Sequence, residues 1–143
     1  MLSNNLNSNH RVAFAAVADF LIPAYNKYPS ASSVGVHTKM LDEVLGHRPD
    51  IIPAFLRGLA VIDVGNLSST INVLYKDDPE GFSAISLAAT SGYYMTETVR
   101  KVLGYPGQES VVYDAYEVPD FLINQNLENV VRRGPIYRPT PVE

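Results

Sequence analysis

Apolar residues that recur every three or four positions are the feature of this sequence that most restricts its fold. In the first such stretch the apolar positions are Ala13, Ala16, Val17, Phe20 and Leu21. This spacing gathers the apolar side chains on one face of an α-helix, which must then be covered by another element. The polar–apolar alternation of a β-rich fold does not recur along the chain. The sequence therefore predicts a mainly α protein.

Capping residues and helix breakers set the limits of the first two helices. Ser8 or Asn9 is placed to cap a helix that ends just before Pro23, because proline cannot continue it. A second, short helix is predicted over residues 38–45. Gly46 then occupies a position that favours left-handed termination.

The next two segments are also predicted as helices, with one alternative. Asp50 opens a third helix, because its carboxylate can accept hydrogen bonds from the first free amides. The inward positions of this helix are Ile52, Phe55, Leu56, Leu59 and Ile62. Residues 67–75 fit a fourth helix, although Thr70, Ile71 and Val73 make a strand an alternative there.

Asp78 and Pro79 form a strong helix start, because a capping side chain is followed by proline at the first helical position. The helix after them is predicted to be the core of the fold. Its inward face consists of Phe82, Ile85, Ala89 and Tyr93. Thr96 is expected to cap a further short helix that Gly104 closes.

The character of the chain changes at Tyr105, because proline, tyrosine and glycine follow every few residues. Only residues 120–131 keep helical periodicity beyond this point. The 143 residues, 46% of them hydrophobic, suit one compact domain. We therefore predict a polar N-terminal arm (1–9), a helical body (10–104) and an extended tail with one helix (105–143) that clasps a partner.

Composition excludes several classes of function. The net charge of −4 argues against a nucleic-acid-binding surface, which needs basic residues to neutralise phosphates. The absence of cysteine excludes disulfides, thiolate nucleophiles and cysteine-bound metals. No apolar run approaches the roughly 20 residues that cross a bilayer, so direct membrane insertion is not expected.

Residues that could perform chemistry do not form a recognisable site in the sequence. His37 and His47 lie ten residues apart, and neither has another histidine three or four positions away; the one glutamate at that spacing is Glu43, four positions before His47. Adjacent carboxylates such as Asp77 and Asp78 point in different directions on a helix. The glycines match neither a P-loop nor a dinucleotide-binding pattern. We therefore predict no catalytic, cofactor-binding or metal-binding residue in this chain.

Tyrosine and proline point instead to a protein interface. Five of the nine tyrosines lie between residues 93 and 116, and tyrosine combines a large apolar ring with a polar tip. The C-terminal prolines favour an extended chain that can lie across a neighbour. The predicted partner-binding residues are Tyr93, Tyr94, Tyr105, Pro106, Tyr113, Tyr116, Ile136, Tyr137, Arg138 and Pro139.

Several segments together resemble the gluconate 2-dehydrogenase subunit 3 family. They are AAVADFLIPA (15–24), PSASSVGV (29–36), LDEVL (41–45), YYMTETVRKVLGYPGQ (93–108) and GPIYRPTP (134–141). The resemblance covers most of the chain. Its most specific part is the tyrosine, methionine, V-R and L-G-Y-P-G series.

The resemblance implies a small accessory subunit without chemistry of its own. Members of that family accompany a large subunit of the glucose–methanol–choline oxidoreductase group, which carries FAD and oxidises sugars, sugar acids or related alcohols. In some members a cytochrome subunit receives the electrons. Family small subunits often bear a twin-arginine signal for export to the periplasm. This sequence contains no such signal, so a cytoplasmic location is equally open.

Two other functions remain open from the residues alone. One is a self-associating structural or binding module, in which the tail exchanges between copies. The other is a small freestanding enzyme that uses Asp19 or His37 together with tyrosines.

Overall fold

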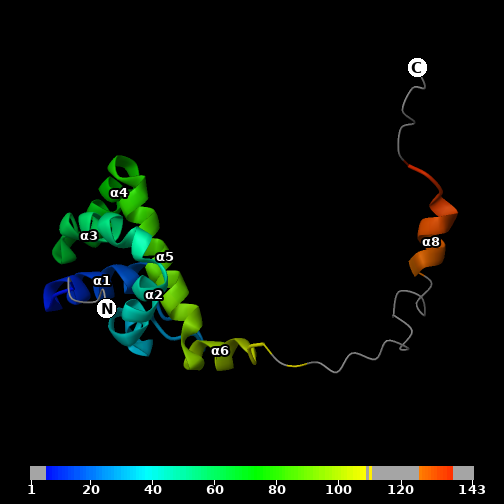
Figure 1. The fold of residues 1–143 in the computed structure, drawn as a ribbon, viewed down its shortest axis with the longest axis horizontal. Coiled ribbons are helices and arrows are strands. Elements are labelled where there is room, and N and C mark those ends of the chain that lie inside the picture. Colours follow the sequence, from blue (N-terminus) through cyan, green and yellow to red (C-terminus); the bar gives the residue numbers. More distant parts are fainter. Residues whose placement is uncertain (1–5, 109, 111–125, 137–143) are drawn as a thin grey trace, which may run out of the picture. The chain divides into compact units, whose positions relative to one another are not determined.

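The computed structural model describes residues 6–108, 110 and 126–136 (Figure 1). Seven α-helices and several short 3-10 or π turns lie in these residues, and no strand is found among them. The predicted mainly α fold is confirmed. The chain divides into two compact units, Met1–Gln108 and Glu109–Glu143, which are described separately below. The first unit contains helices α1 to α6, and the second contains α8.

Helix α1 (Ser8–Leu21) begins one or two residues earlier than expected. Its cap is Asn7 and not Ser8 or Asn9, because the Asn7 side chain accepts a hydrogen bond from the His10 amide at 2.8 Å. The ring of His10 accepts in return from the Asn7 amide at 3.4 Å. This reciprocal arrangement satisfies two amides that a helix start leaves free. The buried side of α1 consists of Phe14, Val17 and Ala18, so the predicted apolar face was wrong in part: Phe20 is 48% exposed.

The second predicted helix is preceded by a π turn. Residues Val36–Met40 form this turn and lead directly into α2 (Leu41–His47). Arg11 of α1 stabilises the turn, because one of its terminal nitrogens donates to the carbonyls of His37 and Thr38 at 3.1 and 3.2 Å. The other donates to the Asp42 carboxylate at 2.7 Å. Arg11 thus fastens α1 to the start of α2.

Helices α3 (Ile52–Ala60) and α4 (Leu67–Asp77) form a bent pair. The strand alternative for residues 67–75 is wrong, because they are helical throughout. Asp50 does not cap α3 as predicted. It lies in a preceding 3-10 turn, and its carboxylate pairs with Arg48 at 2.7 Å. No single described helix is long and apolar enough to cross a bilayer; residues 49–60 and 64–77 reach that length and composition only together, across a 73° bend.

Helix α5 (Pro79–Met95) is the longest of the described helices and contacts α1, α2, α3, α4 and α6 (Figure 1). Its predicted start is confirmed, because the Asp78 carboxylate accepts from the Gly81 amide at 3.0 Å. Gly81 lies against Gly58 of α3. A Cβ at Gly58 would be only 3.1 Å from the Gly81 carbonyl oxygen, so the two glycines let the helices cross closely.

Helix α6 (Glu97–Leu103) closes the body and ends at Gly104, which has a φ of 71°. This left-handed termination is as predicted. Thr96 precedes the helix, but its side chain does not cap it. The hydroxyl donates to the Tyr93 carbonyl at 2.8 Å instead, so it closes the end of α5.

Acid should weaken the junction between α3 and α5. Arg57 holds the pKa of the Asp78 carboxyl below its ordinary value through two hydrogen bonds, with a further contribution from the Gly81 amide. A carboxylate with a lowered folded-state pKa stabilises the fold fully above its unfolded pKa of about 4, and this stabilisation is lost as the pH falls through the folded value. We expect Asp78→Asn to be less stable than the native chain at pH 7, with a difference that shrinks towards pH 2. Urea unfolding at both pH values measures it, and a pH-independent difference would contradict the assignment.

Candidate partner-binding surface

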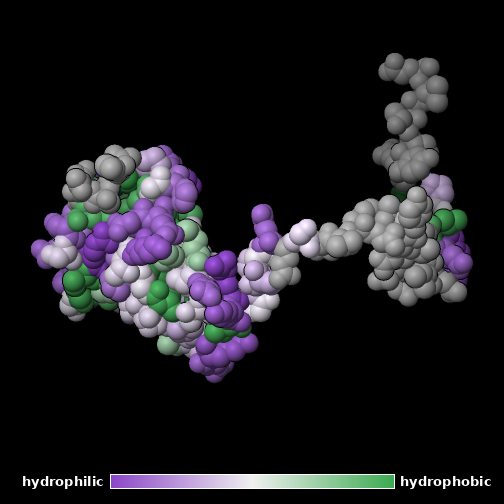
Figure 2. Space-filling model, turned by 60° about the horizontal axis from the view of Figure 1, so that its bottom comes forward, coloured by the Kyte–Doolittle hydropathy of each residue, from purple (hydrophilic) through white to green (hydrophobic). Residues whose placement is uncertain are grey.

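Large apolar side chains are exposed where α5 ends and α6 leads out of the body. Tyr94 is 53% exposed, Met95 37%, Leu103 45% and Tyr105 56%. All four lie within the segment 93–108, and Pro106 next to Tyr105 is exposed as well. Figure 2 shows hydrophobic areas between hydrophilic ones on the surface of the body. We call Tyr94, Met95, Leu103, Tyr105 and Pro106 the α5–α6 surface.

Tyr93 does not belong to this surface, although it was predicted to bind a partner. Its side chain is 4% exposed, and its hydroxyl donates to the Pro29 carbonyl at 2.8 Å. Burial raises the pKa of this phenol. The ring packs edge-on against Tyr94, with 5.5 Å between the ring centroids. Tyr93 therefore packs against Tyr94 and holds the loop around Pro29, so its buried ring is not available to a partner.

A tight turn positions Tyr105 and Pro106. Gly104 and Gly107 both adopt positive φ angles, 71° and 99°, which favour glycine. The Tyr105 amide donates back to the Arg100 carbonyl at 2.9 Å. The chain is thereby turned away from α6 with the tyrosine ring facing solvent. The L-G-Y-P-G sequence encodes this turn through its two glycines.

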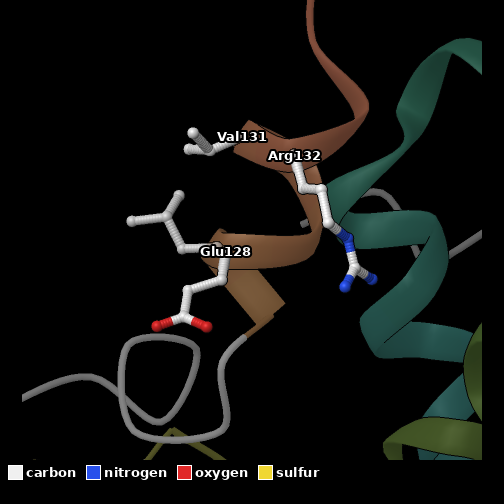
Figure 3. A pocket seen from close by; sticks show the side chains of 4 residues that line it. Glu128, Val131 and Arg132 are labelled. Atoms are coloured by element: carbon white, nitrogen blue, oxygen red, sulfur yellow. The ribbon is translucent and has the colours of Figure 1, made fainter.

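The predicted binding residues of the tail are only partly described. Ile136 is 72% exposed. Tyr113, Tyr116, Tyr137, Arg138 and Pro139 lie outside the described residues. Helix α8 (Asn126–Arg133) overlaps the predicted helical stretch 120–131 and extends two residues beyond it. A pocket of about 450 Å³ is lined by Leu127 and by the residues labelled in Figure 3, Glu128, Val131 and Arg132.

Some exposed apolar residues escaped the sequence prediction. Met95 and Leu103 were not predicted to bind a partner, because helical spacing alone does not tell which apolar side chains stay uncovered. Leu127, Val130 and Val131 of α8 also stand out, with exposures of 46%, 58% and 72%. Their spacing of three and four is visible in the sequence and would have revealed an amphipathic helix.

Asp19 and His37 are the candidate catalytic residues of the enzyme alternative, and both take part in contacts that join α1 to the residues after it. The Asp19 carboxylate accepts from the Ser32 amide at 2.7 Å and from the Ser32 hydroxyl at 2.5 Å. It thus fastens the loop after α1 to that helix. His37 lies in the π turn, where Arg11 binds its carbonyl. Within the described ranges, no three histidine or carboxylate side chains gather as metal ligands.

Comparisons of the chain with protein-family models, with curated proteins and with solved structures return no significant match.

Proposed function

We propose that this chain is a non-catalytic small subunit that binds and stabilises the FAD-carrying large subunit of a sugar or alcohol dehydrogenase. The supporting observation is the α5–α6 surface, which lies in the segment 93–108 that carries the most specific part of the family resemblance. Part of this segment builds the core through Tyr93, and its neighbours remain exposed.

The chemistry of the α5–α6 surface suits a partner that is itself a folded protein. Tyrosine and methionine are enriched at protein interfaces. Both bury a large apolar area on binding, and the polar hydroxyl of tyrosine keeps its ring compatible with water before assembly. A subunit that binds only the folded large subunit raises its stability by mass action. At a concentration about 100 times the Kd, this gain is about 2.7 kcal/mol.

Producing the large subunit with and without this chain tests the proposal. The chain is expected to copurify with the yellow flavoprotein in a fixed ratio, and the complex is expected to unfold at a higher temperature than the large subunit alone. A large subunit that is fully active and equally stable on its own, and that does not retain this chain, would overturn the proposal.

Tyr94 and Tyr105 should contribute strongly to binding. Replacing either by alanine removes an exposed aromatic ring from the proposed interface, and we expect the Kd for the large subunit to rise about tenfold or more. Tyr25→Ala is the matched control, because Tyr25 is 72% exposed but lies outside the α5–α6 surface. Titration of the labelled chain with the large subunit measures the three constants. Equal effects of all three substitutions would mean that binding does not depend on this surface.

A further inference from the structure

Helix α8 has an apolar stripe that the described residues leave uncovered. Leu127, Val130 and Val131 recur at three and four positions, and each is at least 46% exposed. Eight residues amount to about two helical turns, which rarely form a stable helix in water without packing against another surface. The stripe is the part of α8 that can supply such packing.

Charged residues of opposite sign lie along the two edges of this stripe. Successive residues of a helix are turned by about 100°, so Glu128 lies about 60° from Val131, on one edge. Arg133 lies about 60° from Val130, on the other edge. Arg132 lies about 40° beyond Glu128, and Glu128, Val131 and Arg132 line one pocket (Figure 3). Arg132 donates to Asn129 at 2.8 Å.

This charge pattern fits a protein groove better than a lipid surface. An amphipathic helix that lies on an anionic membrane carries basic residues on both sides of its apolar face. Here Glu128 lies between the apolar stripe and Arg132 on one side, and residues 109–125 add four more carboxylates without a basic residue. A groove in a protein can match both signs, with one basic and one acidic rim.

We propose that α8 docks into an apolar groove of the large subunit that has a basic rim facing Glu128 and an acidic rim facing Arg133. This inference rests on the proposed function. It gives the chain a second contact with the large subunit, in addition to the one made by the α5–α6 surface. Both contacts belong to one chain, so the second forms at a high effective concentration once the first has formed. The binding mode is that of a helix in a groove, with anchors at positions i, i+3 and i+4.

Alanine substitutions in the full chain test the apolar anchors without weakening the helix. Alanine has a higher helix propensity than valine, so a loss of binding by the double variant Val130→Ala/Val131→Ala cannot come from a lower helix propensity of α8. We expect its Kd for the purified large subunit to rise about tenfold or more. Asn129→Ala, on the opposite side of the same helix, is the matched control and should change the Kd less than about twofold.

Reversing the charge of Arg133 or Glu128 tests the proposed charged rims of the groove. Arg133→Glu is expected to weaken binding severalfold at low salt, with a smaller effect at high salt, because screening weakens interactions between exposed charges. Glu128→Lys should act in the same direction. If the native chain and the double valine variant bind the large subunit equally well, the proposed docking of α8 is wrong, whereas the proposed function stands.

Two further measurements would show whether the apolar stripe of α8 binds a second copy of this chain or a lipid surface instead of the large subunit. Light scattering of the isolated chain would reveal a dimer that the valine variant abolishes, and flotation with phosphatidylserine–phosphatidylcholine vesicles would reveal lipid binding that depends on α8. Either result, together with unchanged affinity of the valine variant for the large subunit, would overturn the proposal. A native chain that does not bind the large subunit would overturn the inference and the proposed function together.

Discussion

Replacing Phe55 by alanine is expected to lower the free energy of unfolding of the body by about 3–5 kcal/mol. The Phe55 side chain is fully buried and packs edge-on against Phe14, with 5.2 Å between the ring centroids. The substitution removes the ring and leaves a cavity between α1 and α3 that the surrounding helices can only partly fill. Because small domains are stable by only about 5–15 kcal/mol, this loss is a large part of the total.

Urea unfolding followed by circular dichroism measures the effect. Phe20→Ala is the matched control, because it removes the same ring from a position in α1 that is 48% exposed. We expect it to cost less than about 1 kcal/mol. The milder variant Phe55→Leu keeps the prediction testable if Phe55→Ala does not fold. Equal losses for the two alanine variants would show that the α1–α3 contact is not the centre of the core.

Replacing Gly81 by alanine is expected to cost about 2–3 kcal/mol, although alanine is the better helix former. A Cβ at this position would overlap the Asp78 carboxylate and would lie 3.2 Å from the Gly58 Cα. Asp78 would have to turn away, and its bonds to the Gly81 amide and to Arg57 would be lost. The α3 and α5 backbones would also have to move apart.

Gly46→Ala provides the comparison for this glycine. Gly46 lies in α2, and a Cβ there would meet no atom within 4 Å. Alanine should therefore stabilise the chain by about 0.5–1 kcal/mol through helix propensity alone. Thermal unfolding of both variants shows directly whether each substitution raises or lowers the stability of the chain. A stabilising Gly81→Ala would mean that α3 and α5 do not cross at the two glycines.

Local signals in the sequence predicted much of the helical body. The helical spacing of α3, the Asp78–Pro79 start of α5 and the Gly104 end of α6 are all found in the structure. The helix α1 is found as well, but its buried face differs from the predicted one. These features depend on residues within one or two turns of each other. Hydrogen bonds between nearby residues and the restricted φ of proline determine them, so the sequence by itself contains the necessary information.

The candidate surface was harder to predict, because exposure depends on which helices pack together. Tyr93 and Tyr94 are neighbours with the same side chain, yet one is 4% and the other 53% exposed. The 100° turn between successive helical residues directs Tyr93 towards the core and Tyr94 away from it. The position of the core side of α5 is set by all the helices that contact it.

Only the tertiary structure decided the features that join distant segments. The π turn at residues 36–40 is fastened by Arg11, more than 20 residues earlier in the chain. The close crossing at Gly58 and Gly81 and the bond from Tyr93 to Pro29 likewise join separate helices and loops. The sequence determined where most helices of the body form, because helix formation is local. Which of their faces meet, and hence which tyrosines remain for a partner, was decided by packing between residues far apart in the chain.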